Sequence, residues 1–211
     1  MFPLRATIDL SAIAHNTRLL AEQAGDATLM CVIKADAYNH GVERCVPVME
    51  ANGADAFGVA TFAEARRVRG LTSKPVLAWL WDVGEDIPEG VDVGVPSVAH
   101  LRSLIDAPSA PTIYLKVDTG MHRSGIDEKR WGEAYALAAQ AQRQGKCTVA
   151  GLMTHLSCAD DPSDPYTDAQ AAAFRRAIAQ ARQEGLAVER NHMANSPATW
   201  TRPDLHFDMV R

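Results

Sequence analysis

Eight short runs, most of them apolar, alternate with helix-like segments along this chain of 211 residues. The runs that predict strands lie at residues 29–33, 56–60, 75–80, 91–95, 112–117, 147–154, 188–194 and 207–210. Continuous apolar runs of this length are typical of strands that a parallel sheet buries on both faces. The alternation therefore predicts an α/β fold, a (β/α)8 barrel of the TIM type over residues 11–211. A doubly wound open sheet is disfavoured, because no glycine-rich turn follows the first run.

Capping residues, apolar stripes and closing glycines predict helices between most of these runs. The predicted helices lie at residues 11–23, 42–52, 62–69, 97–106, 128–144 and 167–184. Ser11 is the predicted cap of the first helix, and Thr167 with Gln170 forms a capping-box pattern at the start of the last. Residues 1–10 are predicted as a separate N-terminal segment with a short strand at 5–10.

The chain ends on the eighth predicted strand, at Arg211, without an eighth helix. Barrels of this type usually need about 250 residues. We therefore expect a barrel that is cut short after strand eight.

Composition disfavours several classes of function. The formal net charge of −5 gives no basic surface for nucleic acid and no polybasic membrane anchor. No stretch reaches the roughly 20 apolar residues of a membrane span, and residues 1–10 lack a signal-peptide pattern. The four cysteines show no paired metal-ligand spacing. These features predict a reduced, cytoplasmic protein without a metal site, a membrane span or a nucleic-acid partner.

Polar and charged residues follow several of the predicted strands. Lys34 comes directly after the first run, and Tyr38 lies in the loop behind it. The other candidates, on or after later strands, are Lys116, Arg123, His155, Asn195, Ser196 and Arg211. Each has an ordinary structural explanation, such as a lysine that extends into water or a serine that caps a helix. Because barrels keep their active sites where the carboxyl ends of strands meet, the joint placement favours a functional site.

The types of these residues indicate one kind of ligand. A desolvated lysine at a strand end can lose its proton and bind an aldehyde covalently. Asn195, Ser196 and Pro197 offer a hydroxyl, free backbone amides and the first turn of a short helix, which suit a phosphate after strand seven. An aldehyde and a phosphate on one ligand indicate pyridoxal phosphate.

Five motifs in this chain resemble those of bacterial alanine racemases. They are VIKADAYNHG at 32–41, KVDTGMHRSG at 116–125, THLSCAD at 154–160, HMANSPA at 192–198 and DMVR at 208–211. The likeness covers essentially the whole chain, with the motifs in the same order. It implies the pyridoxal phosphate-binding barrel of an enzyme that interconverts L-alanine and D-alanine, the latter for the peptidoglycan of the cell wall.

The resemblance also implies roles for individual residues. Lys34 would carry the cofactor and then act as the base on the face of Cα that serves D-alanine. Tyr38 and Ser196 match positions that hold the phosphate. Trp79 matches a position that packs near the cofactor.

Basic residues complete the implied site. Arg123 matches the arginine that contacts the phenolic oxygen of the cofactor and helps to place the substrate carboxylate. Lys116 matches a lysine that is often carbamylated in the family, and the resulting anion would orient Arg123. Arg211 matches the arginine that donates to the pyridine nitrogen, with His155 as its supporting partner. Because a guanidinium cannot accept a proton, the ring nitrogen stays unprotonated, which disfavours a long-lived carbanion.

The chain departs from the family in two respects. Asn39 and His122 replace glycines that are common in the family, and both residue types tolerate unusual backbone angles in loops. Family members also continue into a β-rich domain that supplies a tyrosine base for the opposite face of Cα, normally across a homodimer interface. No such domain can be read in this sequence, so we expect little turnover by these 211 residues alone.

Two other functions fit the motifs less well. A non-catalytic, single-barrel carrier of pyridoxal phosphate shares the lysine-bearing barrel, but the 116–125 motif and Arg211 argue against it. A barrel-type amino-acid decarboxylase is disfavoured, because related decarboxylases resemble an arrangement with a carboxylate where this chain has Arg211.

Overall fold

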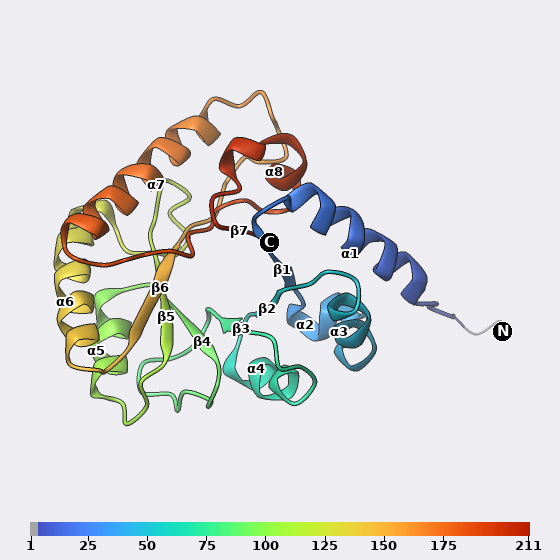
Figure 1. Cartoon of the computed structure of the whole chain (residues 1–211), viewed down its shortest axis with the longest axis horizontal. Coiled ribbons are helices and arrows are strands. Elements are labelled where there is room, and N and C mark those ends of the chain that lie inside the picture. Colours follow the sequence, from blue (N-terminus) through green and yellow to red (C-terminus); the bar gives the residue numbers. More distant parts are fainter. Residues whose placement is uncertain (1–3) are drawn as a thin grey trace.

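The chain folds into a curled parallel sheet surrounded by helices (Figure 1). A computed structural model describes residues 4–211. The strands are β1 (Thr28–Val32), β2 (Ala56–Val59), β3 (Val76–Ala78), β4 (Asp92–Val95), β5 (Thr112–Lys116), β6 (Thr148–Met153) and β7 (Met209–Val210). They pair in the order β6-β5-β4-β3-β2-β1-β7, with every pairing parallel. Neighbours in the sheet are thus neighbours in sequence, except that the last strand, β7, pairs with the first, β1. This is the order of a barrel and not of an open doubly wound sheet.

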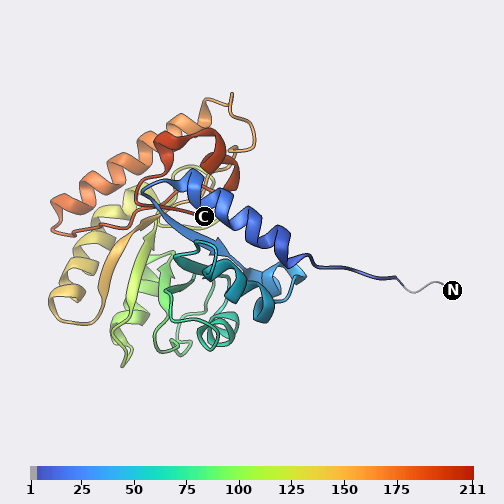
Figure 2. The same ribbon diagram turned by 45° about the vertical axis from the view of Figure 1, so that its right-hand side comes forward.

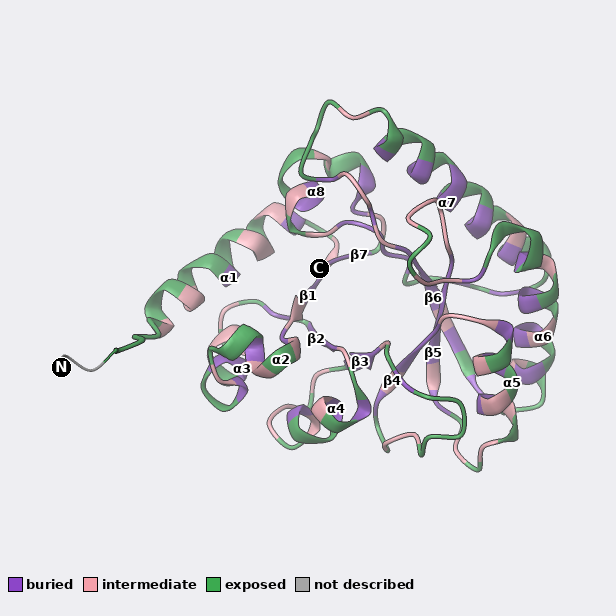
Figure 3. Cartoon of the chain, turned by 180° about the vertical axis from the view of Figure 1, so that it is seen from behind, coloured by how far each residue is buried: buried purple, intermediate pink, exposed green. Residues whose placement is uncertain are grey.

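Helices connect the strands and cover the outer face of the sheet (Figure 3). The α-helices are α1 (Leu10–Ala24), α2 (Lys34–Asn39), α3 (Val42–Glu50), α4 (Phe62–Arg69), α5 (Val98–Asp106), α6 (Trp131–Arg143), α7 (Tyr166–Gln183) and α8 (Ser196–Thr201). Two short 3-10 helices are η1 (Glu128–Arg130) and η2 (Pro203–Leu205). Each predicted helix is present close to its expected bounds, although the one at 128–144 divides into η1 and α6. Across residues 4–211, no helix has the length and apolar character to cross a membrane.

The segment at residues 188–194 closes the sheet between β6 and β7. The sequence predicts a strand there, and that prediction is wrong: in the described part of the chain, the segment forms β-bridges only through His192, with Met153 and Met209. Val188 has a left-handed φ of 29°, which interrupts strand geometry. Backbone hydrogen bonds still join the segment to β6 at 3.0 Å. On the other side, the amides of Asp208 and Arg211, which flank β7, donate to carbonyls of the segment at 3.1 Å.

The N-terminal segment is not a strand where the structure describes it. Residues 4–9 have no strand partner and lead away from the sheet (Figure 2), so the strand predicted at 5–10 is wrong. The first three residues of the predicted 1–10 segment lie outside the described residues. α1 begins at Leu10, and its cap is Asp9 rather than Ser11, because Asp9 Oδ1 accepts from the Ser11 amide at 2.8 Å.

The capping box predicted at the start of α7 is also wrong. The helix begins at Tyr166, after Pro165, without any hydrogen bond from a capping side chain. Thr167 and Gln170 are both buried instead. Because tertiary packing buries both side chains, neither caps the helix as their spacing indicates.

Two apolar clusters lie on opposite faces of the sheet. The larger one fills the space between the strands and the helices. The smaller one lies inside the curled sheet and consists of Met30, Ala56, Leu77, Tyr114, Met153 and Met209. The strands are therefore buried on both faces, which is what their continuous apolar runs predict.

Candidate active site

A cavity of about 580 Å³ opens at the carboxyl ends of the strands. Every candidate site residue predicted from the sequence lines it: Lys34, Tyr38, Trp79, Lys116, Arg123, His155, Asn195, Ser196 and Arg211. They lie at the end of, or beyond, β1, β3, β5, β6, β7 and the closing segment at 188–194. A cavity of this size suits a cofactor or a small-molecule ligand. The barrel therefore brings together side chains that are almost 180 residues apart in the sequence.

Lys34 begins α2, immediately beyond β1, and is half-buried at the cavity wall. Beyond Lys34, α2 is not a right-handed α-helix but a left-handed turn, because residues 35–39 all have φ between 51° and 65°. Left-handed backbone costs a non-glycine residue about 1–2 kcal/mol, so the surrounding structure must hold this turn in place. The turn brings the Tyr38 ring centroid to 5.8 Å from Lys34 Nζ. The predicted tolerance of unusual angles at Asn39 and His122 is confirmed, with φ of 65° and 56°.

The carboxylate of Glu64 holds the backbone next to Lys34. Its Oε1 accepts from the Ala35 amide at 2.8 Å, and its Oε2 accepts from the Ala60 amide at 2.8 Å. Glu64 also completes a capping box with Thr61 at the start of α4. One side chain on α4 thus links the end of β1 to the end of β2 and anchors the left-handed turn.

Two glycines leave room for Trp79 at the cavity wall. A Cβ on Gly58 would lie 2.8 Å from the Trp79 ring, and a Cβ on Gly94 would lie 2.9 Å from Trp79 Cβ. Any larger residue at either position would displace the indole. Glycines in β2 and β4 therefore position an aromatic ring that follows β3, the strand between them.

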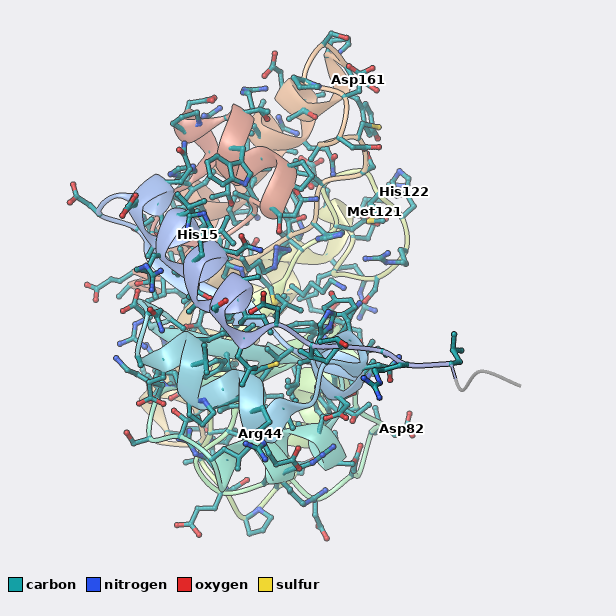
Figure 4. All side chains as sticks on the ribbon, turned by 90° about the vertical axis from the view of Figure 1, so that its right-hand side faces the viewer. His15, Arg44, Asp82, Met121, His122 and Asp161 are labelled. Carbon is teal, nitrogen blue, oxygen red and sulfur yellow. The ribbon has the colours of Figure 1, made fainter. Side chains whose placement is uncertain are left out.

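Lys116 is 7% exposed at the end of β5. Burial, followed by the nearby guanidinium groups of Arg123 and Arg211, lowers the pKa of Lys116 to about 8. Arg123 lies on the loop after β5, whose outward-projecting residues Met121 and His122 are labelled in Figure 4. A lysine with this pKa is partly uncharged near neutral pH, and the uncharged amine is the form that reacts with carbonyl carbon or carbon dioxide.

Arg211 reaches across the cavity from the end of β7. Its Nη2 donates to the Thr154 carbonyl and, at 3.1 Å, to Nδ1 of His155. Burial, followed by the charge of Arg211, lowers the pKa of His155 to about 3, so the imidazole is neutral and can accept this hydrogen bond. The other terminal nitrogen, Nη1, is buried and has no hydrogen-bond partner within residues 4–211. A buried N–H without a partner is costly, and it suits an acceptor atom on a ligand in the cavity.

α8 begins at the cavity, and Asn195 is its cap. The Asn195 side chain accepts from the Ala198 amide at 3.3 Å, so it is already used by the fold. Ser196 is the first helical residue and not the cap, and its side chain is exposed at the cavity. Pro197 follows in the first turn, as the sequence predicts. Of this group, the Ser196 hydroxyl is therefore the side chain best placed to meet a ligand.

Several cavity residues carried no functional signal in the sequence. They come from α1, β1 and α3 and include Ile13, Asn16, Thr17, Leu20, Cys31 and Met49. Their pattern indicates only an amphipathic helix and a buried strand. Asn16 and Thr17 are the polar residues of α1 that could have indicated a site. The Thr17 hydroxyl, however, donates within its own helix, to the Ile13 carbonyl at 2.8 Å.

Comparison with known proteins identifies the family. A model of the family described as alanine racemase, N-terminal domain, matches residues 8–211 of this chain. The alanine racemase of Corynebacterium efficiens is 54% identical over 217 residues, a match that covers 99% of this chain and 58% of that protein. The chain therefore spans less than two thirds of the length of this relative.

Solved structures of alanine racemases share the fold. The crystal structure of alanine racemase from Corynebacterium glutamicum has a TM-score of 0.94 and 49% identity, over 100% of this chain and 62% of that one. The structure from Bartonella henselae, with covalently bound pyridoxal phosphate, has a TM-score of 0.83 and 26% identity, over 100% of this chain and 62% of that one. The chain belongs to the alanine racemase family and contains its N-terminal barrel domain.

Proposed function

We propose that the full-length protein is a pyridoxal phosphate-dependent alanine racemase and that this chain is its cofactor-binding barrel. One observation carries the proposal: the side chains suited to hold and use that cofactor converge on a single cavity. The alanine racemase of Corynebacterium efficiens, at 54% identity, supports the reaction. The pyridoxal phosphate bound covalently in the Bartonella henselae structure supports the cofactor.

The residues present fit this cofactor. Lys34 offers an amine for the aldehyde at the end of β1. Ser196, the backbone at the start of α8 and Tyr38 offer hydroxyl and amide donors for the phosphate. Arg211 Nη1, a buried donor without a partner among residues 4–211, suits the ring nitrogen. The aromatic face of Trp79 can pack against the cofactor.

When bound, pyridoxal phosphate supplies an electron sink that stabilises negative charge at the Cα of an amino acid. Lys34 would hold the cofactor aldehyde through its amine, and the free amine would move the proton on the face of Cα that serves D-alanine. The left-handed turn and Glu64 keep this amine at the end of β1, so that its reach to Cα is defined.

Arg211 controls the charge of the ring nitrogen. A guanidinium donates and does not accept a proton near neutral pH, so a ring nitrogen that faced Arg211 would stay unprotonated. Neutral His155 accepts from Arg211 and holds it in place. This arrangement favours rapid proton return over side reactions, and it disfavours a decarboxylase, in which we expect a carboxylate at the position of Arg211.

In this proposal, Arg123 binds the substrate carboxylate and Lys116 orients Arg123. The Arg123 guanidinium suits the carboxylate of an amino acid and the phenolic oxygen of the cofactor. Lys116, with its lowered pKa, is suited to carbamylation, which would replace a cation beside Arg123 with an anion that orients it.

The assembly of the complete enzyme is part of the same proposal. We propose a cytoplasmic homodimer that acts on alanine. The barrel would occupy residues 11–211, and a separate β-rich domain would supply the tyrosine base for the opposite face of Cα. The match of this chain to 58% of the Corynebacterium efficiens protein is consistent with that division.

The proposal is tested on the full-length protein with pyridoxal phosphate. Borohydride reduction should attach the cofactor permanently to one lysine, and peptide mass mapping should identify Lys34. Lys34→Ala should lose both the label and the exchange between L-alanine and D-alanine, whereas Lys146→Ala, at an exposed position, should keep both. Release of carbon dioxide without enantiomer exchange would identify a decarboxylase instead. A labelled protein that turns over no amino acid would identify a carrier.

A further inference from the structure

Gln170 is completely buried in α7 and uses both ends of its amide. Its Oε1 accepts from the Ser157 amide at 2.9 Å and from the Ser157 hydroxyl at 3.0 Å. Its Nε2 donates to Thr119 Oγ1 at 3.1 Å and to the His155 carbonyl at 3.1 Å. A buried glutamine with four hydrogen bonds to three residues is a strong local constraint, because removing it leaves several buried polar groups unpaired.

The partners of Gln170 lie on the two loops that follow β5 and β6. Thr119 belongs to the loop after β5, and its hydroxyl also bonds to Thr154 Oγ1 at 2.9 Å. Thr154 and His155 follow β6, and both contact Arg211 directly. Gln170 therefore contacts His155, which in turn contacts the guanidinium that we assign to the cofactor ring. Gln170 itself does not line the cavity.

A second contact from the start of α7 holds the same β5 loop. The Tyr166 hydroxyl donates to the Gly120 carbonyl at 2.9 Å. Gly120 has φ of 132°, and a Cβ there would lie 2.4 Å from the Tyr166 hydroxyl oxygen, so this approach requires glycine. Arg123 lies three residues further along this loop. The first five residues of α7 thus fix the loops that carry both Arg123 and His155.

The chemistry of an amide suits this position better than that of a charged group. A neutral amide supplies two donors and an acceptor without placing a charge in the interior. A carboxylate of the same length retains the acceptor for Ser157 but has no donor for the His155 carbonyl or for Thr119. The donor half of Gln170 is thus the half that faces the site.

We infer that Gln170 is a positioning residue, which sets the placement of His155 and Arg211 on one side and of the Arg123 loop on the other. The inference rests on the proposed function, because it assigns Gln170 to the support of the cofactor site. It assigns no contact between Gln170 and the cofactor or the substrate.

The test compares three substitutions in the full-length protein. Gln170→Met keeps the length of the side chain and removes all four hydrogen bonds. Gln170→Glu keeps the acceptor half and removes the donor half. The matched control is Gln142→Met on α6, because Gln142 accepts from the Val149 amide at 2.7 Å near the opposite end of β6.

Hydrogen exchange of the cofactor-free protein is the first readout. Exchange in segments 119–123 and 154–158 should increase at least tenfold in both Gln170 variants and should not change in Gln142→Met. Equal exchange in the Gln170 variants and the unsubstituted protein would overturn the inference. If Gln170→Met does not fold, Thr119→Val provides the measurement, because it removes one partner of the amide, and it should increase exchange in the same segments.

Affinity for pyridoxal phosphate, titrated by absorbance, is the second readout. Gln170→Met and Gln170→Glu should both bind pyridoxal phosphate at least fivefold more weakly than Gln142→Met does. The comparison holds between variants whose melting temperatures have fallen by the same amount. Full affinity in both Gln170 variants would show that the donor half has no positioning role, because methionine cannot donate even where a buried glutamate is protonated. A failure of the unsubstituted protein to bind the cofactor would contradict the proposed function, whereas normal binding by all variants would contradict only the role of Gln170.

Discussion

Replacing Lys116 with methionine should stabilise the protein near neutral pH while damaging the site. The lysine is 7% exposed, and burial, reinforced by two neighbouring guanidinium groups, lowers its pKa from 10.5 to about 8. The unfolded chain therefore binds this proton more tightly than the folded chain. At about 1.4 kcal/mol for each pKa unit, the folded state loses about 3 kcal/mol below pH 8. This cost declines as the pH rises from about 8 to 10.5, because the folded lysine is then neutral and the unfolded lysine gains progressively less from binding its proton.

The assay is urea unfolding of the cofactor-free, full-length protein at pH 7 and pH 10.5, in buffer free of carbon dioxide. Lys116→Met should raise the free energy of unfolding by about 3 kcal/mol at pH 7 and by well under about 1 kcal/mol at pH 10.5. The exposed Lys146→Met is the control and should show no such dependence on pH. Added bicarbonate should reduce the gain at pH 7 if Lys116 becomes carbamylated. A gain of the same size at both pH values would refute the electrostatic reasoning.

Further predictions concern close packing and the left-handed turn. Gly151→Ala should destabilise the protein by about 1–3 kcal/mol, because its Cβ would lie 2.3 Å from the Arg190 carbonyl oxygen. Gly132→Ala on α6, where the Cβ would lie 3.4 Å from Gln180 Nε2, should instead be neutral or stabilise by up to about 1 kcal/mol, and thermal denaturation of both glycine variants measures the difference. Glu64→Ala should lose about 2–4 kcal/mol and weaken borohydride labelling of the cofactor-binding lysine, since charged hydrogen bonds contribute about 1.5–3 kcal/mol each. Thr61→Ala should lose about 1 kcal/mol and leave labelling unchanged, because it removes a cap without touching the turn. Equal labelling by these last two variants would contradict the role given to Glu64.

Much of the fold could be predicted because its signals are local. The helix predicted at 62–69 is α4 with the same bounds, because a capping box begins it and a glycine follows it. Strands such as β5 and β6 appear within one residue of their predicted bounds, because a strand buried on both faces needs a continuous apolar run. The same logic placed Lys34, His155 and Arg211 at strand ends.

Other elements could not be predicted, because distant residues decide them. The sequence predicts a strand at residues 188–194. In the structure, Val188 has a left-handed φ, and His192 is the only residue of the segment that forms β-bridges within residues 4–211. The spacing of Thr167 and Gln170 indicates a capping box, but burial against the β5 and β6 loops redirects the Gln170 amide. A local pattern cannot report which of two partners a polar side chain will meet after packing.

The sequence by itself determined the family of this protein, the barrel order of its strands and the identity of the side chains at the strand ends. Only the tertiary structure decided how those side chains are charged and held. Lys116 has its lowered pKa because folding buries it beside Arg123 and Arg211, and Arg211 keeps a buried donor without a partner in residues 4–211. The left-handed turn after Lys34 depends on Glu64, about thirty residues away in sequence. Desolvation and electrostatic interaction depend on distance in space, and folding alone sets that distance.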